Sequence, residues 1–94
     1  MKIIGFVWYN EIVRKIEQKH DVQQNEVREV FAKHPRFRFV EKGHKPDGNV
    51  YAALGRTRSG RYLIIFFIYK NDKFALIISA RDMTHGERMK YEQK

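Results

Sequence analysis

The sequence of 94 residues contains no cysteine. A disulfide framework, a cysteine nucleophile and a cysteine-based zinc site are therefore excluded, and the composition suits a reducing compartment. Long hydrophobic runs are also missing, because the longest, Tyr62 to Tyr69, is far shorter than the about 20 residues that span a bilayer. The first eight residues lack the charged and hydrophobic segments of a secretory signal. We therefore expect a cytoplasmic protein without membrane contact.

Several common site motifs are absent as well. The histidines at positions 20, 34, 44 and 85 are isolated from one another, so no metal site is expected. The glycine-containing segment 55–60 fits a strand end and a turn better than a phosphate-binding loop. Neither Ser59 nor Ser79 has the sequence context of a serine nucleophile. We expect no cofactor.

The charge of the chain is strongly one-sided, with 19 Lys and Arg against 11 Asp and Glu and a net charge of +8. Residues 33–61 hold eight basic and two acidic groups, so a net +6 lies in the middle third of the sequence. A concentrated positive field is typical of proteins that bind phosphate, although it also serves solubility. We interpret this excess as a docking surface for RNA or a protein partner. Its candidate RNA-binding residues are Arg36, Arg38, Lys42, Lys45, Arg58 and Arg61.

Hydrophobic spacing predicts two helices in the first third of the chain. Ile12, Val13, Ile16 and His20 follow helical periodicity over residues 11–20, with Asn10 as the expected N-cap. A second helix is expected from about Gln23 to the residue before Pro35, with Glu26 in the position of a capping box. The preceding segment, residues 2–8, fits a strand or an extended lead-in.

From residue 36 the pattern changes to that of strands. Four strands are expected over residues 36–42, 50–57, 61–69 and 74–81, joined by short turns, and Thr84 with Glu87 marks the start of a last helix. Short connections imply an antiparallel meander with helices packed on one face. The sequence therefore predicts one α+β domain over residues 1–94, with two N-terminal helices, a four-stranded antiparallel sheet and a C-terminal helix.

Side chains suited to RNA cleavage lie at the ends of these elements. Cleavage by internal attack needs a base for the 2′-hydroxyl proton, cations for the phosphorane charge and an acid for the leaving oxygen. The candidates are Lys19, His20, Arg56, Arg81, Glu87, Arg88 and Tyr91. Capping of Thr84 would by itself explain Glu87, and His20 also fits a structural position at a helix end. Arg81 follows a hydrophobic strand, where an unpaired cation is costly, so we expect it to have an acidic partner or a phosphate-like ligand.

Five segments together resemble the BrnT-like toxins. They occur in the family's order and are Phe6-Val7-Trp8, Lys19-His20 with Val22, Leu54-Gly55-Arg56 with Ser59-Gly60-Arg61, Ile78-Ser79-Ala80-Arg81, and Glu87-Arg88 with Tyr91-Glu92. Tyr9 and Asp21 stand where many members have an acidic residue and a glycine, which marks a divergent branch.

The resemblance implies a fold similar to the RelE and ParE toxins and a metal-independent ribonuclease that blocks translation. It also implies an antitoxin partner with a ribbon-helix-helix DNA-binding part. In this hypothesis Arg56 and Arg81 stabilise the phosphate charge, and Lys19 or His20 transfers a proton. Glu87, Arg88 or Tyr91 assists. The alternative is a noncatalytic basic domain that binds RNA or a protein partner.

Overall fold

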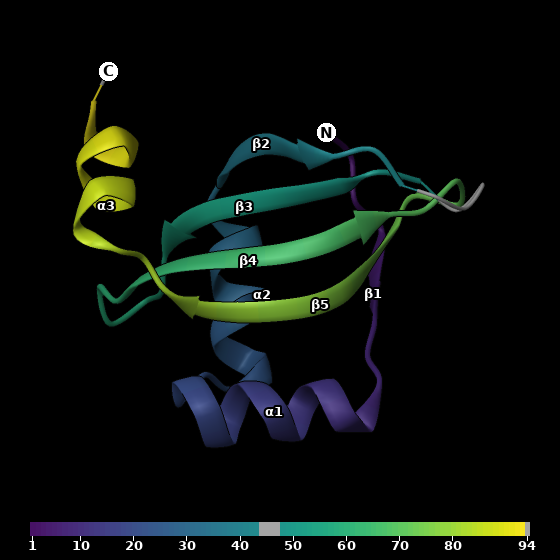
Figure 1. The fold of residues 1–94 in the computed structure, drawn as a ribbon, viewed down its shortest axis with the longest axis horizontal. Coiled ribbons are helices and arrows are strands. Elements are labelled where there is room, and N and C mark those ends of the chain that lie inside the picture. Colours follow the sequence, from purple (N-terminus) through teal and green to yellow (C-terminus); the bar gives the residue numbers. More distant parts are fainter. Residues whose placement is uncertain (44–47, 94) are drawn as a thin grey trace.

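The computed structural model describes residues 1–43 and 48–93 (Figure 1). These residues form, in chain order, β1 (Gly5–Val7), α1 (Asn10–His20), α2 (Gln24–Ala32), β2 (Arg36–Glu41), β3 (Val50–Arg56), β4 (Tyr62–Tyr69), β5 (Phe74–Asp82) and α3 (His85–Glu92). The strands make one five-stranded sheet in the order β1-β5-β4-β3-β2. The predicted α+β class and the antiparallel meander from β2 to β5 are confirmed.

The expectation of a four-stranded, purely antiparallel sheet is wrong because β1 adds a fifth strand. Gly5 to Val7 pairs in parallel with Phe74 to Leu76 at the edge of the sheet. Parallel pairing requires a crossover, which α1 and the following elements supply. At Gly5 a Cβ atom would lie 2.5 Å from a ring carbon of Phe74, so glycine permits the close approach of the two strands. The sheet is therefore mixed.

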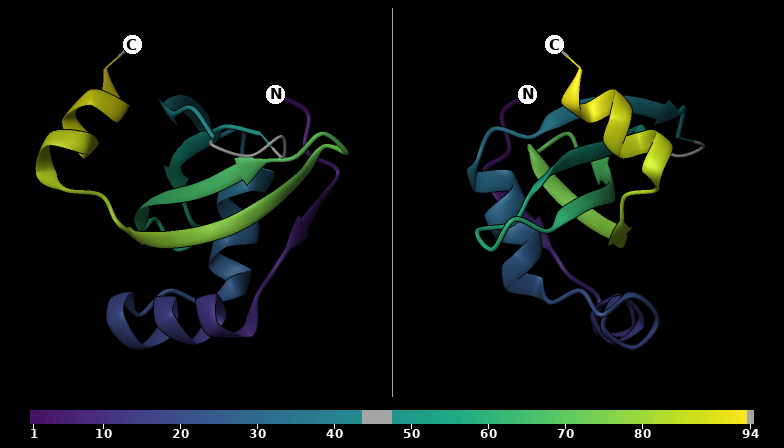
Figure 2. Two further views of the ribbon diagram at one scale, coloured as in Figure 1. Left: turned by 45° about the vertical axis from the view of Figure 1, so that its right-hand side comes forward. Right: turned by 90° about the vertical axis from the view of Figure 1, so that its left-hand side faces the viewer.

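Helices α1 and α2 cover one face of the sheet and enclose the main core (Figure 2). Ile16 of α1 and Val27 and Val30 of α2 are fully buried against strand residues such as Ile65 and Phe67. Each buried aliphatic or aromatic side chain of this kind contributes about 1.5–3 kcal/mol. This layer is the main source of stability and fixes the position of the sheet.

Helix α3 lies against the opposite face, so the expectation that the helices pack on one face is wrong for this element (Figure 2). Tyr91 of α3 and Met83, which lies just before the helix, pack on a smaller cluster formed by Ala52, Leu54 and Ile64. No residue of α3 is itself buried. We call the sheet face opposite α1 and α2, on which α3 lies, the open face.

The helix starts follow the capping patterns in part. Gln23 and Glu26 form a capping box, as do Thr84 and Glu87, whose backbone N–H donates to the Thr84 hydroxyl at 3.1 Å. Helix α1 differs from the prediction, because Asn10 is its first residue and Tyr9 is the N-cap, without a side-chain hydrogen bond. Within residues 1–43 and 48–93, no helix is long and apolar enough to cross a membrane.

Candidate functional site

Arg81 and Glu87 form a two-contact ion pair where β5 leads into α3. The two terminal nitrogens of Arg81 donate to the two carboxylate oxygens of Glu87 at 2.8 and 3.0 Å. The expected acidic partner of Arg81 is thus present, six residues along the chain. Both Arg81 and Glu87 are partly exposed, with 32% and 17% of their side-chain surface accessible.

This pair controls the ionisation of Glu87. The hydrogen bonds from Arg81 lower the pKa of the Glu87 carboxyl to about 2, and the bond from the Thr84 backbone N–H contributes in the same direction. Glu87 in turn raises the pKa of Arg81. Glu87 is therefore ionised at neutral pH and has no proton to donate, so its geometry suits positioning of Arg81.

Arg81 keeps part of its hydrogen-bonding capacity after pairing with Glu87. A guanidinium carries five N–H donors. Besides the two bonds to Glu87, Nη1 donates to the Asp82 carbonyl at 3.1 Å. None of the described residues accepts a bond from Nε. The Nε side of the guanidinium, which offers two parallel N–H groups, thus remains available for an anion such as phosphate.

Arg56, Arg88 and two tyrosines gather beside Arg81 at the same end of the open face. The guanidinium carbons of Arg56 and Arg88 lie 4.6 and 3.9 Å from the ring centre of Tyr62. Tyr91 meets Tyr62 edge to face at 6.0 Å. Since cation–π contacts hold guanidinium groups without consuming their N–H donors, both arginines keep most of their donors. We call Arg56, Tyr62, Arg88 and Tyr91 the arginine–tyrosine cluster.

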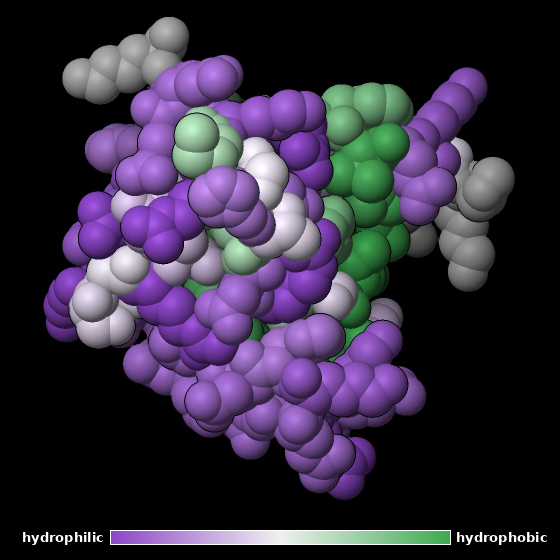
Figure 3. All heavy atoms as spheres, turned by 60° about the vertical axis from the view of Figure 1, so that its left-hand side comes forward, coloured by the Kyte–Doolittle hydropathy of each residue, from purple (hydrophilic) through white to green (hydrophobic). Residues whose placement is uncertain are grey.

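Strand register explains why these side chains meet. Arg56 pairs with Tyr62 across the β3–β4 turn, and Arg81 pairs with Ile64 two residues further along β4. Successive side chains alternate between the two faces of a strand, so Arg56, Tyr62, Ile64 and Arg81 all point to the open face. Figure 3 shows a hydrophobic strip on the surface next to a mainly hydrophilic region.

The register also places two of the predicted RNA-binding residues on this face. Arg36 and Arg38 pair with Leu54 and Ala52, whose side chains belong to the cluster under α3. Arg36 is held to α3, because its Nη1 donates to the Gln93 carbonyl at 2.7 Å and its guanidinium lies 5.5 Å from the Tyr91 ring centre. The exposed Arg38 makes no such contact with the described part of the chain.

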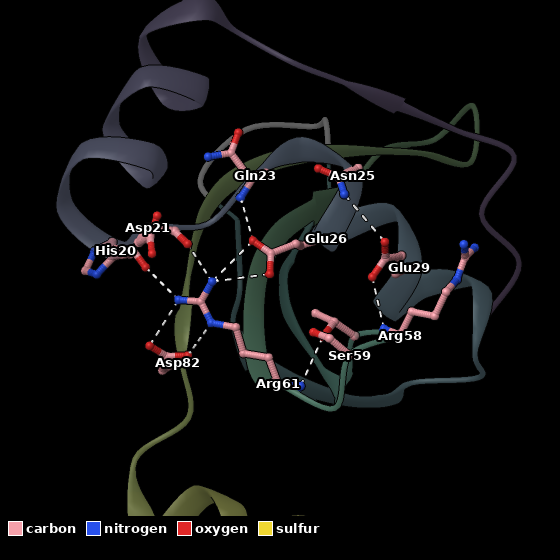
Figure 4. A network of polar contacts seen from close by, with 11 residues as sticks. His20, Asp21, Gln23, Asn25, Glu26, Glu29, Arg58, Ser59, Arg61 and Asp82 are labelled. Atoms are coloured by element: carbon pink, nitrogen blue, oxygen red, sulfur yellow. Dashed lines mark hydrogen bonds and ion pairs between the residues drawn. The ribbon is translucent and has the colours of Figure 1, made fainter.

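Arg61, another predicted RNA-binding residue, is instead the centre of a structural network (Figure 4). Its Nε and Nη2 donate to the Asp82 carboxylate at 2.7 and 3.2 Å, and its Nη1 contacts the Glu26 carboxylate at 3.2 Å. The carbonyls of His20 and Asp21 accept further bonds from the terminal nitrogens. All five N–H donors thus have acceptors within the protein. Arg61 joins the end of α1, the start of α2 and the end of β5.

This network also shifts two ionisation equilibria. The hydrogen bond from Arg61 lowers the pKa of Asp82, and the charges of Arg61 and His20 act in the same direction. The bond to Asp82, with a smaller contribution from Glu26, raises the pKa of Arg61. The contacts of Arg61 therefore favour a role in stability over phosphate binding, while its assignment to RNA binding stays a prediction.

Lys19 and His20 lie at the end of α1, apart from the open face. Lys19 is exposed, and His20 is partly buried near Asp82, the residue after Arg81. The structure thus brings together Arg56, Arg81, Glu87, Arg88 and Tyr91 but leaves Lys19 and His20 behind the end of the sheet, on the α1 side.

Two of the remaining predicted RNA-binding residues, Lys42 and Arg58, lie at opposite ends of the sheet. Lys42 is exposed at the end of β2, and Lys45 lies outside the described residues. Arg58 is in the β3–β4 turn, and its side chain points away from the Arg61 network (Figure 4).

Sequence reasoning missed Tyr62 and Glu92 as members of the site. The Tyr62 hydroxyl donates to the Glu92 carboxylate at 2.9 Å, and Arg88 Nε lies 3.6 Å from the other oxygen of the same group. The short turn after Arg56 could have identified Tyr62, because a tight hairpin places Arg56 and Tyr62 opposite each other. No group of three or more His, Asp or Glu suited to a metal ion occurs in the ranges 1–43 and 48–93.

The fold and the open face define a small basic α+β protein whose arginines are arranged for a phosphate-bearing ligand. Its fold is similar to the crystal structure of the Brucella abortus ribonuclease toxin BrnT, with a TM-score of 0.63 and 13% sequence identity. The match covers 87% of this chain and 99% of the Brucella chain. At this identity the match establishes the fold. No curated protein matches the sequence.

A family model for the ribonuclease toxin BrnT of type II toxin-antitoxin systems matches residues 8–87. The chain therefore belongs to the BrnT family of ribonuclease toxins, as the sequence resemblance predicted. Membership of a type II toxin-antitoxin family implies a cognate antitoxin as a partner.

Proposed function

We propose that this chain is a metal-independent endoribonuclease that holds single-stranded RNA across the open face, at the end covered by α3. The observation that carries the proposal is the hydrogen bonding of the Arg81 guanidinium. Glu87 fixes the guanidinium in place, yet the Nε side keeps its N–H donors for a phosphate. Family membership supports RNA as the substrate.

In this mechanism Arg81 stabilises the charge that develops on the scissile phosphate. A preorganised donor aimed at developing charge is worth about 10²- to 10³-fold in rate. Arg56 comes from β3, and β4 separates it from Arg81 on β5. Two strand spacings amount to about 10 Å, so Arg56 and Arg81 suit neighbouring phosphates of one RNA strand. Arg88 shares the Tyr62 ring with Arg56 and adds charge at the same position.

Proton transfer is assigned to groups other than Glu87, because a carboxyl with a pKa of about 2 has no proton to donate at neutral pH and is a weak base. Tyr91 is the candidate that lies on the open face, beside Tyr62. His20 and Lys19 remain the alternatives, although both lie at the end of α1, on the other side of the sheet. Replacing Tyr91 by Phe, with His20→Gln and Lys19→Gln as comparisons, tests this assignment through the pH–rate profile of cleavage.

The test of the function is cleavage of single-stranded RNA by purified protein in EDTA. We expect Arg81→Ala to lower the rate by at least about 10²-fold. Arg14→Ala is the matched control, because Arg14 is exposed on α1 and should leave the rate unchanged. Absence of cleavage by the wild-type protein, with or without ribosomes, would contradict the proposal.

The alternative, a noncatalytic domain that binds RNA or a partner through the same face, is favoured by one observation. Arg81 is neutralised by Glu87 in the free protein. RNA affinity that falls steeply with salt, without cleavage and without growth arrest on expression, would support this alternative.

We propose further that the protein acts in the cytoplasm and inhibits translation. We also propose that its cognate antitoxin carries a ribbon-helix-helix DNA-binding part. Co-expression with a small neighbouring gene identifies the antitoxin, because it should relieve growth arrest and co-purify with the toxin, and its sequence then tests for a ribbon-helix-helix part. The expected likeness to RelE and ParE toxins is tested by comparing the arrangement of the β2–β5 meander.

A further inference from the structure

A basic pocket lies beside the arginine–tyrosine cluster. It has a volume of about 330 Å³ and is lined by Lys33, Arg56, Thr57, Arg58, Gly60 and Tyr91. The residues come from the end of α2, the β3–β4 turn and α3, which lie at the same end of the molecule (Figure 2). Three of the six are cations, one is aromatic and none is acidic. This composition suits a nucleotide better than a neutral or cationic ligand.

The cations of this pocket are free of acidic partners, unlike Arg61 and Arg81. Neither Lys33 nor the Arg58 guanidinium forms an ion pair with the residues the structure describes. Arg56 makes one weak side-chain bond, from Nε to the Gly60 carbonyl at 3.4 Å. Cations without acidic partners that converge on one cavity repel one another and create a positive potential there. A bound anion relieves this repulsion.

The wall of the pocket is held in a fixed geometry by the fold. The buried Thr57 hydroxyl contacts Ser59 and accepts from the Arg61 backbone N–H at 3.0 Å. Glu29 of α2 accepts from the backbone N–H of Arg58 at 2.9 Å, which ties the turn to the helix (Figure 4). The carboxylate of Glu29 is therefore engaged with the backbone, and the Arg58 side chain remains free to point elsewhere. A turn whose backbone is fixed in this way loses less entropy on binding than a mobile one.

We propose that this pocket is a subsite for one nucleotide of a single-stranded RNA, next to the position that Arg81 contacts. Lys33 and Arg58 bind a flanking phosphate, Arg56 joins this subsite to the open face, and the Tyr91 ring contacts the ribose or base. The inference rests on the proposed function, because it takes RNA as the ligand of the open face. It adds Lys33 to the binding residues and extends the RNA path beyond the reacting phosphate.

The test measures binding separately from cleavage. A fluorescent ten-nucleotide RNA with 2′-O-methyl groups at every position has no 2′-hydroxyl to attack the phosphate, so it reports affinity alone. Its binding to wild-type protein is followed by anisotropy between 50 and 300 mM salt. The variant is Lys33→Ala with Arg58→Ala, and the charge-matched control is Arg14→Ala with Lys15→Ala on the exposed side of α1.

We expect the Lys33/Arg58 variant to bind more weakly and to lose salt dependence. Each phosphate neutralised on single-stranded nucleic acid contributes about 0.7 to the slope of log affinity against log salt, so loss of the one flanking phosphate should lower the slope by about 0.7. The control should keep the wild-type slope. Melting temperatures of both variants should stay within about 3 °C of wild type, which separates lost binding from lost folding.

An unchanged slope in the Lys33/Arg58 variant would overturn the inference, as would an equal decrease in the control. A variant that binds RNA normally but no longer binds the cognate antitoxin would assign the pocket to the protein partner and would also overturn it. Cleavage of unmodified RNA is measured in parallel. If wild-type protein binds the 2′-O-methyl RNA through this pocket but cleaves nothing, the proposed ribonuclease activity fails while the subsite stands.

Discussion

Replacing Glu87 by Gln should destabilise the protein in a pH-dependent way. The substitution keeps the size of the side chain but removes the charge that pairs with Arg81. The pKa of the Glu87 carboxyl is about 2 in the folded protein against an ordinary value of 4.5. At 1.36 kcal/mol per pKa unit, this difference sets an upper limit of about 3 kcal/mol. Because both groups are partly exposed and water screens their attraction, we expect a loss of about 1–2 kcal/mol.

The sign of the pH dependence follows from the lowered pKa. A carboxyl of this kind stabilises the fold fully above its unfolded pKa of about 4.5, and the stabilisation is lost as the pH falls towards 2. The melting temperature of Glu87→Gln should therefore lie about 5–15 °C below wild type at pH 7, and the difference should narrow below pH 4.5 and close as the pH approaches 2. Circular dichroism melts at pH 7, 5, 4 and 3 measure this convergence.

Glu17→Gln is the matched control, because Glu17 is exposed on α1 and its side chain has no ion pair among the described residues. Its melting temperature should change little at any of these pH values. A stability loss in Glu87→Gln that is equally large at pH 7 and pH 3 would refute the argument from charge. A second readout concerns catalysis: Glu87→Gln should slow cleavage but leave the shape of the pH–rate profile between pH 5 and 9 unchanged, as expected for a positioning residue.

Three further predictions concern the Arg61 network, the α2–β3 contact and the Tyr62 ring. Arg61→Lys keeps the charge but cannot reach all acceptors, so urea unfolding should show a loss of about 2–3 kcal/mol, and a loss below about 0.5 kcal/mol would contradict the network's structural role. Gly55→Ala should cost about 1–3 kcal/mol in the same assay, because a Cβ atom would lie 2.9 Å from Val30 Cγ1, and wild-type stability would show that α2 moves away at no cost. Tyr62→Leu should lower the cleavage rate at least several-fold, because Arg56 and Arg88 lose the ring they share. Tyr62→Phe keeps the ring and should retain most activity. Equal cleavage rates for the two variants would show that the ring has no role in cleavage.

Local patterns in the sequence were sufficient to predict the β2–β5 meander and the acidic partner of Arg81. Alternating side chains and short turns predict β2 to β5, because each of these strands pairs with its neighbour in sequence. The need of Arg81 for an acidic partner followed from its position after a hydrophobic strand, and Glu87 fills that need. In these cases the deciding interactions connect residues close in the chain.

The errors concern interactions that connect distant residues. Strand β1 has three residues and pairs with β5, about 70 positions away, so no local pattern could identify its partner. The side of the sheet occupied by α3 was also not predictable, since α3 has no buried residue and thus a weak hydrophobic pattern. Arg61 and Arg81 look alike in sequence, and the acceptors that distinguish them come from α1, α2 and β5 only after folding.

The shallow attachment of α3 has a consequence for the motions of the molecule. No residue of the helix is buried, and its polar contacts to the sheet are the pair of Glu87 with Arg81, the bond of Glu92 with Tyr62 and the bond of the Gln93 carbonyl with Arg36. Elements held in this way open locally at a free energy below that of global unfolding, so amide hydrogens of α3 should exchange faster than those of α2. The same arginines face the proposed RNA site, so RNA binding there and docking of α3 on the sheet would form one coupled equilibrium. RNA that binds the state in which α3 is docked on the sheet will slow amide exchange in α3. The slowing grows with the ratio of the RNA affinities for the docked and undocked states.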